Sequence, residues 1–280
     1  MPPSGRKRET SILDDTRYPY PIRLLVELTM YVQGPVGLYR RNFVSTRRSV
    51  RTFSAEDEAS THPDLVSYVA SAETALRSVG FGTSHRIVQS TSKKVTGFAA
   101  LLEHAGRGDL ATFMGLRTEI PEAEETRLVS AAVFTTEFAD DVILGTSNVL
   151  TVKRFPTRPN LQPVVFPDVH DPLELYRLHR CRVDERARRV PSRKSTRGAT
   201  PEARIAYQER EAEQVWQHWL RSGYYRPVPD GLRPTLRGAA LMTWRGMWPW
   251  KQLTERRHVR DARAVRARCD GTHPGPPERR

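Results

Sequence analysis

The first regular pattern of apolar residues lies in the second quarter of the chain. Apolar side chains recur there at spacings of three and four, at Leu65, Val69, Ala72, Leu76 and Val79. This period predicts an amphipathic helix over 64–79 with one face buried. Gly80 and Gly82 follow directly and mark the end of the helix.

Beyond this helix the apolar residues form short runs separated by polar turns, a pattern typical of strands. Four of the runs form two pairs, 95–102 with 111–117 and 130–138 with 142–147. We therefore predict two consecutive hairpins that form a small antiparallel sheet, with the helix packed on one face. Runs at 149–155 and 161–166 would add strands at the rim only, because the prolines around them cannot donate to a ladder.

The last third of the chain carries helix signals instead. We predict helices over 171–189, 200–222, 235–248 and 253–268. Asp171 offers a side-chain acceptor at the start of the first of these helices, and Pro172 suits the first helical position. A turn at Asp230–Gly231 separates the second helix from the third.

These elements predict an α+β protein: a small antiparallel sheet of two hairpins packed with a helix, followed by an Arg-rich helical C-terminal region. The expected divisions are a disordered basic tail at 1–17, a short apolar helix and linker at 18–62, an α+β sheet domain at 63–170, a basic helical region at 171–269 and a disordered tail at 270–280. At 280 residues and 38% hydrophobic content, the chain can bury a sizeable core.

Charge is distributed unevenly along the chain. The total is +13, and residues 1–53 contribute +6, residues 54–170 contribute −5 and residues 171–280 contribute +12. Arginine makes up 39 of the 45 basic residues. A guanidinium group binds phosphate or carboxylate in a bidentate manner, which favours an anionic partner, although a genome rich in G·C codons would also raise the arginine share.

The basic C-terminal segment suggests a non-enzymatic binding protein that engages a polyanion, either nucleic acid or an acidic protein partner. The candidate polyanion-binding residues are Arg233, Arg237, Arg245, Arg256, Arg257, Arg260 and Arg263. The interpretation requires that these side chains form an exposed patch that the protein's own carboxylates do not neutralise.

Peripheral attachment to an anionic membrane surface is the alternative. The apolar segment 22–32 is too short to span a bilayer, so no transmembrane helix is predicted. It could lie on a membrane or dock a partner, or it could be an ordinary core helix. Trp248 and Trp250 flank Pro249 and are the tryptophans expected to be exposed and to contact membrane or partner, whereas Trp216, Trp219 and Trp244 are expected in the core.

No sequence motif for a catalytic centre, a metal or a cofactor is present, so none of these is predicted. The eight histidines are scattered and are expected to be structural or exposed. An enzyme without a recognisable motif, with its site in the sheet region, stays a third possibility. Cys181 and Cys269 allow one disulfide at most, and the absence of a signal peptide pattern predicts a cytoplasmic location.

Two parts of the chain resemble known kinds of sequence. Segments 175–180 and 233–244 resemble sequences from an uncharacterised bacterial family, which implies one α+β unit over much of 64–260 and no particular activity. Segment 200–248 resembles the end of a winged-helix module, with a helix, a two-stranded wing and another helix. Three prolines in the wing and four glutamates on the would-be recognition helix depart from that pattern.

Overall fold

The computed structural model describes residues 29, 31, 33–40, 42, 44–45, 49–82, 84–92, 95–120, 125–149, 155–193, 200–229, 231–247 and 249–271. The predicted tail at 1–17, most of the apolar segment 22–32, Trp248 and residues 272–280 lie outside the described residues.

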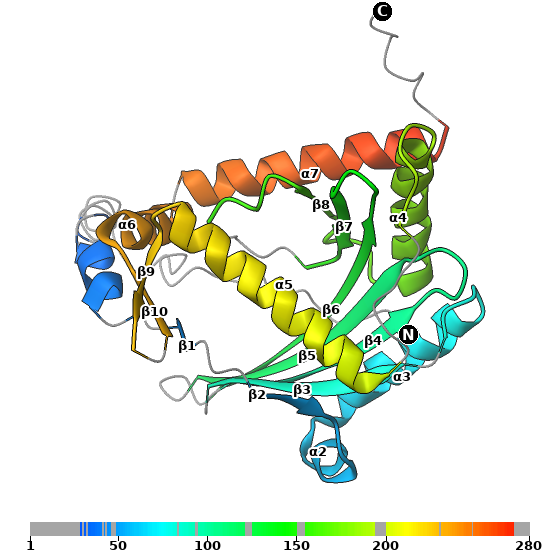
Figure 1. Cartoon of the computed structure of the whole chain (residues 1–280), viewed down its shortest axis with the longest axis horizontal. Coiled ribbons are helices and arrows are strands. Elements are labelled where there is room, and N and C mark those ends of the chain that lie inside the picture. Colours follow the sequence, from blue (N-terminus) through cyan, green and yellow to red (C-terminus); the bar gives the residue numbers. More distant parts are fainter. Residues whose placement is uncertain are drawn as a thin grey trace, which may run out of the picture.

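A seven-stranded mixed sheet forms the centre of the molecule (Figure 1). Its strands, in spatial order, are β2 (Ser49–Thr52), β3 (His85–Ser92), β4 (Val95–Glu103), β5 (Leu110–Ile120), β6 (Glu125–Glu137), β7 (Ile143–Ser147) and β8 (Leu161–Val165). Neighbouring strands are antiparallel except β7 and β8, which are parallel. The protein is α+β, but the prediction of a small antiparallel sheet of two hairpins was wrong.

Three features enlarge the sheet beyond that prediction. The two predicted hairpins are joined edge to edge, because β5 and β6 pair along their whole length from Leu110↔Thr135 to Ile120↔Glu125. On one side β2 and β3 add two strands whose many polar residues show no apolar alternation. On the other side β8 pairs with β7 through a parallel crossover, which depends on tertiary packing rather than on a local turn.

Helices cover both faces of this sheet. The buried side chains of β6 with even numbers, such as Phe134, share one core with α3 (Pro63–Arg77), α4 (Pro172–Ala187) and α7 (Trp250–Cys269). Glu137, with an odd number, faces the opposite side and accepts a hydrogen bond from the hydroxyl of Tyr207 on α5 (Pro201–Arg221) at 3.0 Å. Figure 1 shows α5 running obliquely across that second face. The basic helices α4 and α7 therefore contribute directly to the core of the sheet.

The starts of three predicted C-terminal helices are confirmed, whereas the fourth, α7, begins at Trp250 rather than at Leu253. Asp171 accepts a hydrogen bond from the Leu173 amide at 3.0 Å, and Pro172 is the first residue of α4. Thr200 and Thr235 cap α5 and α6 (Leu236–Arg245) in the same way. The segment 45–62, interpreted as a linker, instead contains β2 and the short helix α2 (Ala55–Ser60).

A second, smaller core lies at the other end of the molecule. The hairpin of β9 (Tyr225–Val228) and β10 (Gly231–Pro234) pairs with β1 (Val44–Ser45) in a three-stranded sheet. Its core contains six buried residues: Phe155, Trp216, Tyr224, Tyr225, Leu232 and Met242. Gly238 lets α6 approach the hairpin closely, since a Cβ there would lie 1.9 Å from the Tyr224 carbonyl oxygen.

Candidate anion-binding site

Four of the seven predicted arginines lie on the solvent side of α7. They are Arg256, Arg257, Arg260 and Arg263, and all four are exposed. The spacings of four and three between Arg256, Arg260 and Arg263 place these side chains along one face of the helix. Asp261 is 3.9 Å from Arg257 and 3.7 Å from Arg260, whereas Arg256 and Arg263 form no ion pair within the described part of the chain. This face of α7 therefore keeps a positive charge.

The other three predicted arginines lie on β10 and α6. Arg233 is exposed on β10, directly opposite Arg226 on β9. Arg237 lies over the Tyr224 ring at 5.4 Å, and Arg245 is half-buried. Figure 1 places β10 and α6 at one end of the molecule, with α7 extending away from them. The structure thus divides the predicted set between two places.

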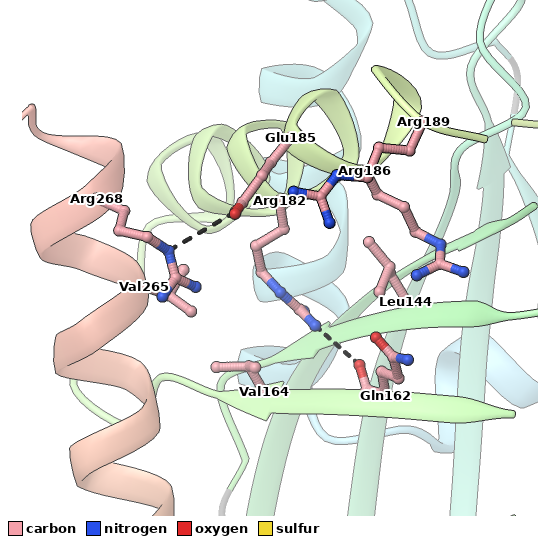
Figure 2. Close-up of a pocket in the computed structure, with 9 residues that line it drawn as sticks. All are labelled: Leu144, Gln162, Val164, Arg182, Glu185, Arg186, Arg189, Val265 and Arg268. Carbon is pink, nitrogen blue, oxygen red and sulfur yellow. Dashed lines mark hydrogen bonds and ion pairs between the residues drawn. The ribbon is translucent and has the colours of Figure 1, made fainter. Parts of the chain in front are cut away.

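A different group of arginines, absent from the predicted set, gathers around a cavity of about 280 Å³ at the far end of α7 (Figure 2). The charged residues that line it are Arg182, Glu185, Arg186, Arg189 and Arg268. Leu144, Gln162, Val164 and Val265 complete the lining. Four guanidinium groups and a single carboxylate thus share one hollow.

The local structure explains why these side chains meet. Arg182 and Arg186 lie four residues apart on α4, and Arg189 follows in the turn after that helix, so all three lie on one side. Arg268 enters from the last turn of α7, which packs beside α4 and β8. Figure 2 shows the side chains of α4 and α7 on either side of the hollow, with β7 and β8 beneath them.

Arg182 is buried and bonded only to neutral acceptors. Its Nη1 donates to the Gly145 carbonyl at 2.5 Å and to Thr146 Oγ1 at 2.7 Å, and its Nη2 donates to the Gln162 carbonyl at 2.8 Å. Burial lowers the pKa of Arg182 to about 10, so the group stays protonated at neutral pH. A buried positive charge without a carboxylate partner favours a nearby anion.

The other three arginines differ in how far they are neutralised. Arg186 pairs with Asp140 and lies over the Phe138 ring at 5.1 Å, yet its buried Nε has no partner among the described residues. Arg268 is 3.7 Å from Glu185. Arg189 is exposed and forms no ion pair with any residue that the structure describes. Taken together, the pocket carries a net positive charge.

A chain of buried hydrogen bonds runs behind the pocket from Arg182 to Asp109. The Thr136 hydroxyl donates to Asp109 Oδ1 at 2.6 Å, so it must accept from His179 Nε2 at 2.9 Å. His179 Nδ1 then accepts from the Thr146 hydroxyl at 3.0 Å, whose oxygen accepts from Arg182. Every donor in this chain points from Arg182 toward Asp109, which fixes the tautomer of His179.

Further hydrogen bonds hold both ends of this hydrogen-bond chain in place. Asp109 is fully buried and also accepts from the Tyr176 hydroxyl at 2.9 Å and from Arg180 Nη1 at 3.0 Å. Burial lowers the pKa of His179 to about 3, so its ring is neutral at physiological pH. With both ring nitrogens hydrogen-bonded, His179 holds the α4 arginines in place from within the core.

A disulfide links the two helices that carry the pocket arginines. Cys181 on α4 and Cys269 on α7 are bonded, and each is the sequence neighbour of a pocket arginine, Arg182 and Arg268 respectively. The disulfide therefore fixes the separation of the two helices that carry the arginines.

The exposure of the tryptophan side chains agrees with the prediction for some of them but not for Trp244. Trp250 is 53% exposed, as expected, and its contact with a membrane or partner stays a prediction. Trp216 is buried and Trp219 half-buried, but Trp244 is 41% exposed rather than in the core. Its indole nitrogen donates to the Tyr31 carbonyl at 3.1 Å, which holds the ring at the surface of α6.

Neither a metal-binding cluster nor a membrane-spanning helix is found among the described residues. Within that part of the chain, no group of three or more histidine, cysteine, aspartate or glutamate side chains could hold a metal ion. None of the described helices is both long and apolar enough to cross a membrane. Comparisons of the chain with protein-family models, with curated proteins and with solved structures gave no match, so function is inferred from the geometry.

Proposed function

We propose that this protein binds a polyanion that carries phosphate groups, with one phosphate in the arginine pocket and further negative charge along α7. The observation that carries this proposal is the convergence of Arg182, Arg186, Arg189 and Arg268 on one cavity with only Glu185 as a lining carboxylate. Guanidinium groups match phosphate oxygens in geometry as well as in charge.

The size of the pocket and the position of α7 support a polymer rather than a single small anion. A cavity of about 280 Å³ accepts one phosphate with its neighbouring atoms, not a folded macromolecule. From Arg268 the exposed arginines continue along α7 to Arg256, over a distance of roughly 18 Å. Neighbouring phosphates of an extended nucleic acid strand could therefore contact the same helix, and an acidic protein segment is the alternative ligand.

A salt titration with a matched pair of variants tests the proposal. The probe is a fluorescein-labelled single-stranded oligonucleotide, with binding followed by anisotropy at increasing salt concentration. We expect affinity to fall steeply with salt, because bound phosphates release counterions. Arg189→Glu should weaken binding about tenfold and reduce the salt slope by roughly one. Arg210→Glu, which reverses an exposed charge on α5, is the control and should have a much smaller effect.

Three outcomes would contradict this function. Wild-type protein that does not bind the oligonucleotide, or binds it independently of salt, removes the proposal. Equal losses in Arg189→Glu and Arg210→Glu would show that only overall charge matters and that the pocket takes no part. Tighter binding of poly-glutamate than of the oligonucleotide would assign the site to an acidic protein partner.

Peripheral membrane binding is a second candidate, supported by exposed apolar side chains at the start of α7. Trp250 is 53% exposed and Leu253 is 51% exposed, three residues apart and next to Arg256 and Arg257. Aromatic and basic residues together favour the headgroup layer of an anionic membrane. Flotation with vesicles of anionic and of neutral lipid tests this candidate, and a Trp250→Ser, Leu253→Ser protein that floats as well as wild type would exclude it.

A cytoplasmic location stays part of the proposal, and the disulfide gives a direct way to test it. Disulfides are uncommon in the cytosol of most organisms. Mass spectrometric mapping of Cys181 and Cys269 after rapid alkylation of cells would show whether they are thiols or bonded there. A fully bonded pair would place the protein in an oxidising compartment instead.

A further inference from the structure

A second cavity lies on the other side of strand β8 and has a different character, since Leu161 lines it whereas the neighbouring Gln162 lines the arginine pocket. Its volume is about 360 Å³, within the range of roughly 300–1,000 Å³ that small-molecule sites occupy. The lining residues whose chemistry matters are Phe155, Arg158, Val215, His218, Trp219 and Tyr225. They come from the loop before β8, from α5 and from β9, so the cavity lies where the small core meets the edge of the large sheet.

Three aromatic rings form a continuous apolar wall. Phe155 lies 5.5 Å from Trp219 and 5.4 Å from Tyr225 between ring centroids, and Trp219 and Tyr225 are stacked at 5.3 Å. Phe155 and Tyr225 are buried members of the small core, so their positions are fixed by packing. Phe155 is also stacked on Tyr224 at 5.0 Å, so the half-buried Trp219 is the ring of this wall that is most open to a ligand.

Among the described residues that line this cavity there is one arginine, and the protein itself neutralises it. The Arg158 side chain is only 10% exposed, and its Nη2 donates to Glu211 Oε2 at 2.6 Å while Nη1 donates to Gln214 Oε1 at 2.5 Å. Because the carboxylate of Glu211 balances the guanidinium charge, a second anion gains little here and would be desolvated at a cost.

Two buried polar atoms of the cavity residues are left without partners. Neither Arg158 Nε nor His218 Nε2 has a hydrogen-bond partner among the described residues, although each atom is inaccessible to solvent. Buried polar atoms are almost always paired in folded proteins. Both atoms belong to residues that line the cavity, so a ligand there can complete one of them once its side chain turns toward the cavity.

We propose that this cavity binds a neutral aromatic molecule of about two rings that carries one hydrogen-bonding group. The rings of the ligand pack against the wall formed by Phe155, Trp219 and Tyr225, and its polar group pairs with His218 Nε2 or Arg158 Nε once that side chain turns toward the cavity. This inference is independent of the arginine pocket, since none of the residues that line one cavity lines the other.

The test uses N-phenyl-1-naphthylamine, a neutral dye with two aromatic parts and one N–H group whose emission rises in apolar surroundings. Wild-type protein should bind this dye saturably at one site per chain. Naphthalene-2-carboxamide should displace the dye, whereas naphthalene-2-carboxylate, which has the same shape and a negative charge, should displace it at least tenfold less well.

Cavity-filling variants locate the dye. Val215→Phe adds a ring inside the cavity and should abolish binding, whereas Val66→Phe adds the same ring at a half-buried position of α3 and should leave binding unchanged. Thr157→Trp fills the cavity from the loop and serves as the second variant if Val215→Phe does not fold. His218→Leu removes the polar contact and should weaken binding about fivefold.

The proposal is overturned by any of three results. One is the absence of saturable dye binding to folded wild-type protein. Another is unchanged binding in a folded cavity-filling variant. The third is displacement by the carboxylate that equals or exceeds displacement by the carboxamide, which would show that the site prefers anions. Failure of the oligonucleotide to bind the arginine pocket has no bearing on these results.

Discussion

Each of the two cavities contains a buried arginine, and the partners of that arginine decide what the cavity can bind. Arg182 donates to two carbonyls and a threonine hydroxyl, so its positive charge is not cancelled and adds to that of three neighbouring arginines. Arg158 donates to a carboxylate and an amide, so its cavity is close to neutral and its character is set by aromatic rings. The same side chain thus supports an anion site in one place and an apolar site in the other.

The two cavities also differ in the structural features that hold their lining residues in place. The arginine pocket is fixed by a hydrogen-bond chain inside the main sheet and by a disulfide between α4 and α7. The apolar cavity depends on the small aromatic core around the β9–β10 hairpin. Changes that disturb one support should therefore leave ligand binding in the other cavity largely intact.

The largest effect is expected from removing the carboxylate that ends the hydrogen-bond chain. Asp109→Ala leaves Thr136, Tyr176 and Arg180 without their common buried acceptor, and such a change typically costs about 3–5 kcal/mol of unfolding free energy. Denaturant unfolding measures the loss. Asp184→Ala removes the other, exposed partner of Arg180 and should cost less than about 1 kcal/mol. Similar losses of unfolding free energy in the two variants would show that the buried hydrogen bonds of Asp109 contribute no more to stability than an exposed ion pair does.

The next largest effect is expected from the disulfide. Replacing both Cys181 and Cys269 by serine removes a link that closes a long loop, with a sequence separation of 88, and should lower the unfolding free energy by about 2–4 kcal/mol. Because Arg182 and Arg268 adjoin the two cysteines, oligonucleotide affinity should fall as well, while binding of the neutral dye should not change. If the double variant keeps the oligonucleotide affinity of wild type, the disulfide is not needed to hold the arginine pocket in its binding geometry.

Local signals predicted the longer helices of this fold but missed the short helix α2, and they did not predict the extent of its sheet. The caps at Asp171, Thr200 and Thr235 and the period of α3 are local, and these elements were predicted correctly. The strand β2 reads Ser-Val-Arg-Thr and lies at a sheet edge, where polar side chains face solvent and no alternation marks a strand. Parallel pairing of β8 with β7 depends on packing that no local pattern encodes.

The candidate sites were harder to predict than the fold. The spacing of Arg182, Arg186 and Arg189 is visible in the sequence, but Arg268 joins them only because α7 packs beside α4. Asp109 falls in a polar turn of the predicted hairpin, and nothing local distinguishes it from a solvated carboxylate, although it is fully buried. Its partners on α4 lie about 70 residues away, so tertiary contacts create the network.

A smaller effect, specific to the arginine-pocket end, concerns pH. The unfolded chain takes up a proton on His179 near the ordinary pKa of 6.5, whereas burial lowers the pKa of this residue in the folded protein to about 3. Between these values the unfolded state binds more protons, so stability falls as the pH is lowered and is regained above 6.5. We expect His179 alone to account for a loss of about 2 kcal/mol between pH 6.5 and pH 5.

Denaturant unfolding at several pH values measures this effect. His179→Gln offers an amide donor and a carbonyl acceptor but cannot be protonated, so its stability should change less over the same window. A variant whose stability falls as steeply as that of wild type would assign the acid sensitivity to other groups. The neutral dye, bound in the apolar cavity, should report no corresponding change until the protein unfolds.

The smallest expected effect is a change in ligand preference, in which the apolar cavity comes to favour an anion as the arginine pocket does. Glu211→Gln keeps a hydrogen-bond acceptor for Arg158 but removes the negative charge that balances the guanidinium group. The apolar cavity should then resemble the arginine pocket, and naphthalene-2-carboxylate should gain about tenfold in affinity relative to naphthalene-2-carboxamide, or roughly 1.4 kcal/mol. Glu209→Gln alters an exposed glutamate two residues earlier on α5 and controls for the change in net charge. If both variants leave the preference as in wild type, the partner of the buried arginine does not determine which ligand its cavity selects, and the contrast between the two ends would need another cause.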